Sequence, residues 1–168
     1  MNAAEAMDAT APTGETEWQR LNRNWEDILQ ELRVIQTGNQ IITGFLLAAA
    51  FQPRFEDLDP VARGIYLSLL AVAAATTIVG LTPVLLHRWL FRMGAKASLV
   101  ALGGRLAAGA LIGVGVTLAG IVLLIVDLVG GLAAGLVAAA ATVAVMAALW
   151  ILLPSRVQTR LRRGEDAG

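Results

Sequence analysis

The 168-residue sequence contains no cysteine and a single histidine, His87. The lack of cysteine excludes disulfide bonds and thiolate metal sites, and one histidine leaves no histidine cluster to hold a metal ion. The sequence also has no glycine-rich phosphate loop and no serine beside a general base, so the motifs of common enzymes are missing. We therefore expect neither an enzyme nor a bound metal or cofactor.

Charge is also scarce. Charged residues make up 15% of the chain and hydrophobic residues 57%, whereas a soluble domain has about 25% charged residues. Four stretches of 18 to 22 residues carry no Asp, Glu, Lys or Arg, namely 34–51, 65–86, 106–126 and 132–153. A helix of this length, at about 1.5 Å per residue, crosses a hydrocarbon core of about 30 Å. The sequence predicts an all-α integral membrane protein, a four-helix bundle surrounded by the lipid bilayer.

The segments on either side of this four-span domain, 34–153, have distinct compositions. Residues 1–16 are rich in small and acidic residues, which predicts a disordered tail. In residues 17–33, apolar side chains recur at spacings of three and four from Trp18 to Leu32, which predicts an amphipathic cytoplasmic helix. This helix lies on the membrane surface, or docks on the bundle or on a partner. The basic tail, 154–168, directly follows a span, where arginines attract anionic lipid, so we expect no nucleic acid as partner.

The basic residues are sorted by side. Eleven Lys and Arg residues lie in 17–33, 87–105 and 154–168, whereas the other connections contain only Arg54 and Arg63. Cytoplasmic loops of membrane proteins carry such an excess of positive charge. We therefore expect an inner (plasma) membrane protein with both termini in the cytoplasm.

The first span differs from the others because it carries a polar stripe, formed by Gln36, Asn39, Gln40 and Thr43. On a helix, Gln36, Gln40 and Thr43 share one face, and Asn39 flanks it. An amide without a hydrogen-bond partner in lipid costs several kcal/mol. The stripe must therefore face other helices, another copy of the chain, or water. It serves interhelical hydrogen bonding, or it lines a path for a monovalent cation or a proton.

Three further residues mark the ends of spans. Pro83 predicts a kink in the second span, either static or a hinge. His87 follows at the inner boundary, as an interfacial anchor or as a pH sensor. Asp127 directly follows the third span, at the C-terminal end of the helix, where the helix dipole disfavours an acid. The acid either pairs with Arg63 or Arg54 at the outer interface or remains solvated.

Small residues recur in the third and fourth spans at spacings of three and four, where close helix approach needs them. The glycines that we expect to act in helix packing are Gly109, Gly113, Gly120, Gly131 and Gly135. The packing could be within one chain or between the copies of a homo-oligomer.

The run from Asn24 to Ile41 (NWEDILQELRVIQTGNQI), together with Pro83-Val84 and the HRWLFR segment from His87 to Arg92, is distinctive. These residues resemble a family of small, uncharacterised actinobacterial membrane proteins, and the similarity spans about residues 22–153. The resemblance implies a four-span membrane protein. Members of that family often carry the label sodium:proton antiporter, which implies ion transport.

Two function classes follow. The first is an oligomeric ion-transport or channel-like subunit, with the polar stripe of the first span as its path. The alternative is a non-catalytic regulatory or assembly subunit of the membrane, which docks partners through its amphipathic helix.

Overall fold

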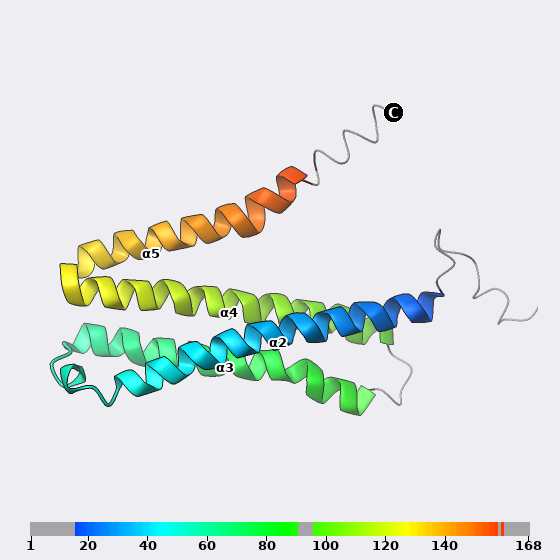
Figure 1. Ribbon diagram of the computed structural model, residues 1–168, viewed down its shortest axis with the longest axis horizontal. Helices are drawn as coiled ribbons and strands as arrows, with labels where there is room; N and C mark the ends of the chain where they lie inside the picture. Colours follow the sequence, from blue (N-terminus) through cyan, green and yellow to red (C-terminus); the bar gives the residue numbers. More distant parts are fainter. Residues whose placement is uncertain (1–15, 91–95, 158, 160–168) are drawn as a thin grey trace, which may run out of the picture. The chain divides into compact units, whose positions relative to one another are not determined.

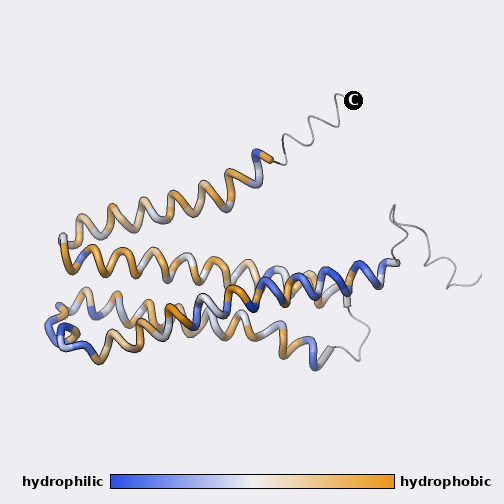
Figure 2. The backbone as a smooth tube through the Cα atoms, in the orientation of Figure 1, coloured by the Kyte–Doolittle hydropathy of each residue, from blue (hydrophilic) through white to orange (hydrophobic). Residues whose placement is uncertain are grey.

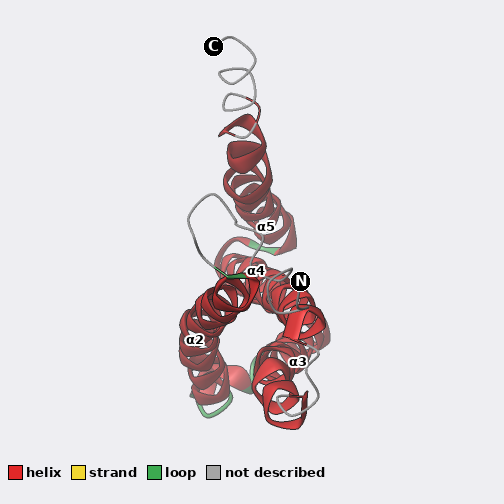
Figure 3. Cartoon of the chain, turned by 90° about the vertical axis from the view of Figure 1, so that its right-hand side faces the viewer, coloured by secondary structure: helices red, strands yellow, loops and turns green. Residues whose placement is uncertain are grey.

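The computed structural model describes residues 16–90, 96–157 and 159. All regular structure in this part of the chain is helical, so the all-α prediction is confirmed for it (Figures 1 and 3). The elements are α2 (Glu17–Ala49), the short 3₁₀ helix η1 (Pro53–Phe55), α3 (Pro60–Leu90), α4 (Lys96–Gly130), α5 (Leu132–Ala147) and the π-helical segment η3 (Ala148–Leu152). Nearly all of the predicted N-terminal tail and most of the basic C-terminal tail lie outside the described residues.

Helix α2 combines two predicted segments, because the amphipathic segment and the first span form one continuous helix of 33 residues. Its start is capped: the backbone N–H of Thr16 donates to Gln19 Oε1 over 2.9 Å, and the N–H of Gln19 donates to Thr16 Oγ1 over 3.3 Å. This is the reciprocal arrangement of a capping box. Figure 2 shows that the first half of α2 is hydrophilic, whereas the second half is mostly apolar.

Three helices are long and apolar enough to cross a membrane: Pro60–Arg88, Ala97–Gly130 and Leu132–Val157. They contain the second, third and fourth predicted spans. Residues 34–49 of the first predicted span, 34–51, lie in α2, which is not among these three helices. Three helices that could cross a membrane are thus observed, and a crossing by α2 stays a prediction.

The chain divides into two compact units. The described part of the first unit comprises residues 16–45, 73–90 and 96–114, which contribute segments of α2, α3 and α4. Its core contains Leu32, Ala107 and Ala110, with Ile28, Ile35 and Val79 packed against it. Ile28 and Leu32 of the predicted apolar stripe thus pack on the protein itself, whereas Trp18 at its start is 56% exposed.

The second unit comprises Leu46–Val72 and the chain from Gly115 onward. The Tyr66 hydroxyl donates to the carbonyl of Leu46 over 2.8 Å, and the Tyr66 ring meets Phe55 edge to face at a centroid distance of 4.8 Å. Tyr66 is only 3% exposed. The Tyr66 ring packs on Phe55 of η1, and the Tyr66 hydroxyl bonds to Leu46 of α2. Tyr66 therefore ties the start of α3 to the end of α2.

A tight turn at Gly131 connects α4 to α5 within the same unit. Gly131 has a φ of 83°, which favours glycine because other residues carry a Cβ that clashes there. Further along, the helix widens into the π-helical segment Ala148–Leu152, directly before Leu153 and Pro154. Proline lacks an N–H and clashes with the carbonyl four residues earlier, so a wider turn relieves both.

Candidate functional site

Two amide side chains in the second half of α2 bind the backbone of α3. Gln36 Nε2 donates to the carbonyl of Thr77 over 2.8 Å. Asn39 Nδ2 donates to the carbonyl of Ala73 over 2.9 Å and to Thr77 Oγ1 over 2.8 Å. Asn39 is completely buried and Gln36 is 9% exposed. These bonds join α2 to the middle of α3.

The other two residues of the predicted stripe lie differently. The Thr43 hydroxyl donates to the carbonyl of Asn39 on its own helix over 2.7 Å, and its side chain is half-buried. Gln40 is exposed. The face toward α3 is therefore formed by Gln36, Asn39 and Thr43, at spacings of three and four, whereas the sequence analysis grouped Gln36 with Gln40.

Gly80 provides the space that Gln36 occupies. A Cβ on Gly80 would lie 2.6 Å from Gln36 Nε2, so the amide lies directly against the α3 backbone. Sequence reasoning gave Gly80 no role. A signal was present, because Ala73, Thr77 and Gly80 place small residues on one face of the second span at spacings of four and three.

The carbonyl oxygens of both amides remain without a partner. Gln36 Oε1 and Asn39 Oδ1 are buried and accept no hydrogen bond among the described residues. The nitrogens cannot exchange places with these oxygens, because they donate to the carbonyls of Thr77 and Ala73. Two neutral oxygen ligands thus lie one helical turn apart inside the first unit. Such oxygens can accept hydrogen bonds from water or contribute to the coordination of a cation.

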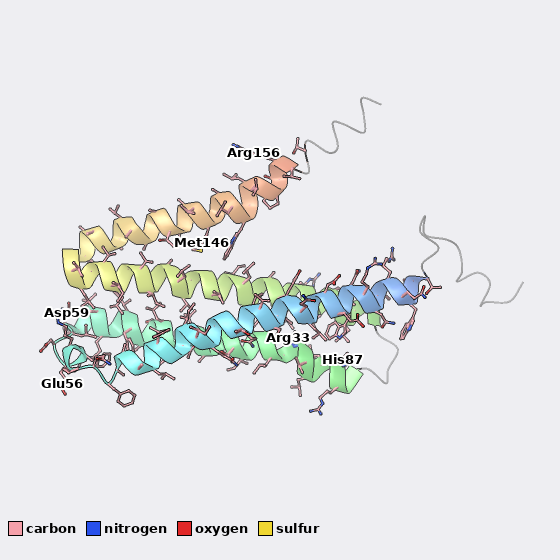
Figure 4. All side chains as sticks on the ribbon, in the orientation of Figure 1. Arg33, Glu56, Asp59, His87, Met146 and Arg156 are labelled. Carbon is pink, nitrogen blue, oxygen red and sulfur yellow. The ribbon has the colours of Figure 1, made fainter. Side chains whose placement is uncertain are left out.

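His87 lies beside an aromatic ring near the end of α3 (Figure 4). Its ring stacks on Trp25 of α2 with 5.3 Å between the centroids and 13° between the planes. Trp25 is 5% exposed, and a Cβ on Gly103 of α4 would lie 2.8 Å from its ring. The Trp25 ring is thus held between α3 and α4, a role that its place in the apolar stripe did not reveal.

Pro83, the hinge candidate, is fully buried, and α3 continues through it to Leu90. The hydroxyl of Thr82 donates to the carbonyl of Ile78 over 2.8 Å, inside the same helix. This part of α3 therefore remains helical despite the proline, and the hinge stays a prediction.

The predicted ion pair at the other end of the spans is not formed within the described residues. Arg63 Nη2 lies 3.5 Å from the carbonyl of Glu56, and neither Asp127 nor Arg54 contributes its side chain to a hydrogen bond or ion pair there. Asp127 instead caps the turn through its backbone, since its carbonyl accepts the N–H of Gly131 over 2.8 Å.

The three glycines of α4 that the sequence analysis assigned to packing, Gly109, Gly113 and Gly120, face α3. A Cβ on Gly113 would collide with the Thr76 hydroxyl, one on Gly120 would collide with Leu69, and one on Gly109 would lie 3.7 Å from Val79. On α5, a Cβ on Gly135 would lie 2.7 Å from the carbonyl oxygen of Leu123 on α4. These glycines therefore act within one chain, while Gly131 serves the turn.

The contact of α4 with α5 also uses Gly115, which the sequence analysis did not single out. A Cβ there would lie 3.2 Å from Met146 Sδ and from the Trp150 ring. Figure 4 shows the Met146 side chain pointing from α5 toward α4.

Within the described residues, no group of three or more His, Cys, Asp or Glu side chains could hold a metal ion. No curated protein and no solved structure matches the chain significantly. The model of the DUF6328 family, a family of unknown function, matches residues 14–154. The chain therefore belongs to the DUF6328 family.

Proposed function

We propose that this DUF6328 protein is an ion-transport or channel-like subunit of a membrane, in which Gln36 and Asn39 form the polar part of the path. The observation that carries the proposal is the pair of buried amide oxygens, Gln36 Oε1 and Asn39 Oδ1, that accept no hydrogen bond. A buried polar atom without a partner costs free energy, and native proteins generally satisfy such atoms with water, an ion or another polar group. A water molecule or a monovalent cation that reaches these two oxygens would satisfy them.

The level of the pair along α3 supports the same function. Asn39 binds the carbonyl of Ala73, which lies near the middle of the candidate span Pro60–Arg88. The free-energy barrier to an ion is highest at the middle of the bilayer, and oxygens at the middle of a span lower the barrier there. The predicted spans 34–51, 65–86, 106–126 and 132–153 contain no Asp, Glu, Lys, Arg or His, so the path would stabilise its ion through neutral dipoles rather than through a carboxylate.

Flux measurements in liposomes test this proposal. The purified protein is reconstituted, and the fluxes of Na⁺, K⁺ and H⁺ are followed with entrapped dyes. The double variant Gln36→Met/Asn39→Leu should lose at least about nine-tenths of the flux, because it removes both oxygens at the highest point of the barrier. The control is Thr82→Val, which removes a hydroxyl that bonds only within α3 and should keep the flux.

A wild-type protein without flux for any of the three ions would contradict the path. A double variant that folds normally, as judged by circular dichroism and gel filtration, and conducts like the wild type would also contradict the path. Absence of flux would favour the second candidate, a non-catalytic regulatory or assembly subunit. What supports that candidate is the exposed charged side of the first half of α2, where Glu26, Asp27 and Glu31 could meet a partner.

A further inference from the structure

The second half of α2 has an exposed face that the proposed ion path does not use. Thr37, Gln40, Ile41 and Gly44 are all exposed there. The Thr37 hydroxyl is satisfied, since it donates to the carbonyl of Arg33 over 2.8 Å. The amide of Gln40, in contrast, has no hydrogen-bond partner among the described residues. Gln40 is therefore the polar group on this face that needs a partner.

The register of α2 against α3 gives the depth of Gln40. Asn39, the preceding residue, binds the carbonyl of Ala73, near the middle of the candidate span Pro60–Arg88. If α3 crosses the bilayer, Gln40 is exposed at about the level of the bilayer centre. Hydrocarbon offers no hydrogen bonds there, so an exposed amide is strongly disfavoured unless another protein surface covers it.

The chemistry of this face matches a second copy of itself. A glutamine amide both donates and accepts, so two Gln40 side chains related by a twofold axis can bond to each other, each Nε2–H donating to the other Oε1. Gly44 lies one turn further along, and a Cβ on it would meet nothing within 4 Å. A glycine with open space beside the amide lets two backbones approach to the distance that such a bond requires.

We propose that the chain forms a homodimer in the membrane through the face of α2 formed by Thr37, Gln40 and Gly44. The two Gln40 amides bond to each other across the twofold axis, and Gly44 is the point of closest approach. This inference goes beyond the ion path, because it uses a different face of α2 and holds whether or not ions cross the protein.

Cysteine crosslinking in lipid vesicles tests the interface directly, because the chain has no cysteine of its own. With the protein reconstituted at low density in phosphatidylcholine vesicles, Thr37→Cys should form a disulfide-linked dimer under mild oxidation. Phe45→Cys is the matched control. Phe45 is 74% exposed but points about 140° away from Gln40 around a helix of 3.6 residues per turn, so it should not crosslink. Equal crosslinking at both positions would overturn the interface.

The role of Gln40 needs a second measurement, the monomer–dimer equilibrium in vesicles by energy transfer between labelled copies. Gln40→Leu should weaken the dimer by about 3- to 30-fold, the range expected for an interhelical hydrogen bond in lipid. Gln30→Leu, the same change at an exposed position in the first half of α2, should leave the equilibrium unchanged. A wild-type monomer, or a dimer of unchanged affinity in Gln40→Leu, would overturn the proposal.

A second substitution separates the hydrogen bond from the close approach. Gly44→Ile fills open space in the isolated chain and should preserve the fold while it abolishes the dimer. The flux experiment gives a result that does not depend on the dimer measurement. A conducting monomer would overturn only the dimer, whereas a dimer without flux would overturn only the ion path.

Discussion

Gly104 and Gly113 lie on the same helix, α4, but in different surroundings. A Cβ on Gly104 would meet nothing within 4 Å, whereas a Cβ on Gly113 would collide with the hydroxyl of Thr76. We expect Gly104→Ala to raise the free energy of unfolding by about 0.5–1 kcal/mol, because glycine is a poor helix former. Gly113→Ala should lower it by about 1–3 kcal/mol, because helices α3 and α4 would have to separate. Unfolding by SDS in mixed micelles measures both, and a common sign for the two variants would contradict the packing.

The sequence predicts that a single polar residue in an apolar span needs a hydrogen-bond partner, but it does not predict which residue that partner is. An amide in an apolar span must bond to something, and Gln36 and Asn39 do. The sequence could not show which residues of the polar stripe are buried. Asn39 and Gln40 are adjacent in sequence, and the position of α3 decides which of them is buried. His87 is a similar case, since a boundary position did not identify Trp25 as its neighbour.

Helix α3 begins with a cap whose strength can be measured. Asp59 Oδ1 accepts the N–H groups of Val61 over 2.7 Å and Ala62 over 3.0 Å, directly before the first turn that starts at Pro60. We expect Asp59→Ala to lower the free energy of unfolding by about 1 kcal/mol, since two backbone donors lose their acceptor. Figure 4 shows Asp59 in the same connection as Glu56, on the exposed segment before α3.

Asp57→Ala is the control for this cap, because it removes an equally exposed acid that caps nothing among the described residues. It should change the free energy of unfolding by less than about 0.5 kcal/mol, as surface substitutions usually do. Equal losses in the two variants would show that net charge, rather than the cap, is responsible.

Whole elements could be predicted where one physical constraint dominates. Runs of about 20 apolar residues without charge favour a helix that can cross a membrane, and three of the four predicted runs lie in helices that are long and apolar enough to do so. The predicted boundary at residue 33 is not a helix end, because no residue in 17–49 breaks a helix: the segment has good helix formers, and its two glycines are tolerated. The change from polar to apolar composition alters the surroundings of α2, not its backbone.

At the scale of the whole molecule, the distribution of charge and hydropathy along the sequence predicts how the chain crosses a membrane. The contacts within each unit carry no information on the number of crossings. The eleven basic residues predicted on one side require an even number of crossings. Three apolar helices alone would give an odd number. The topology therefore depends on whether α2, whose second half carries the amides, also crosses.

Labelling of single cysteines by a membrane-impermeant maleimide distinguishes these topologies, because the wild-type chain has no background reaction. With four crossings, Glu56→Cys and Val129→Cys should react from outside intact cells, whereas Thr10→Cys and Ser155→Cys should react only after the membrane is permeabilised. If α2 does not cross, Thr10→Cys and Ser155→Cys must lie on opposite sides, and one of them becomes reactive from outside. The four-crossing pattern would place Gln40 at the bilayer centre, where its unpartnered amide requires a second protein surface, and the three-crossing pattern would remove that requirement.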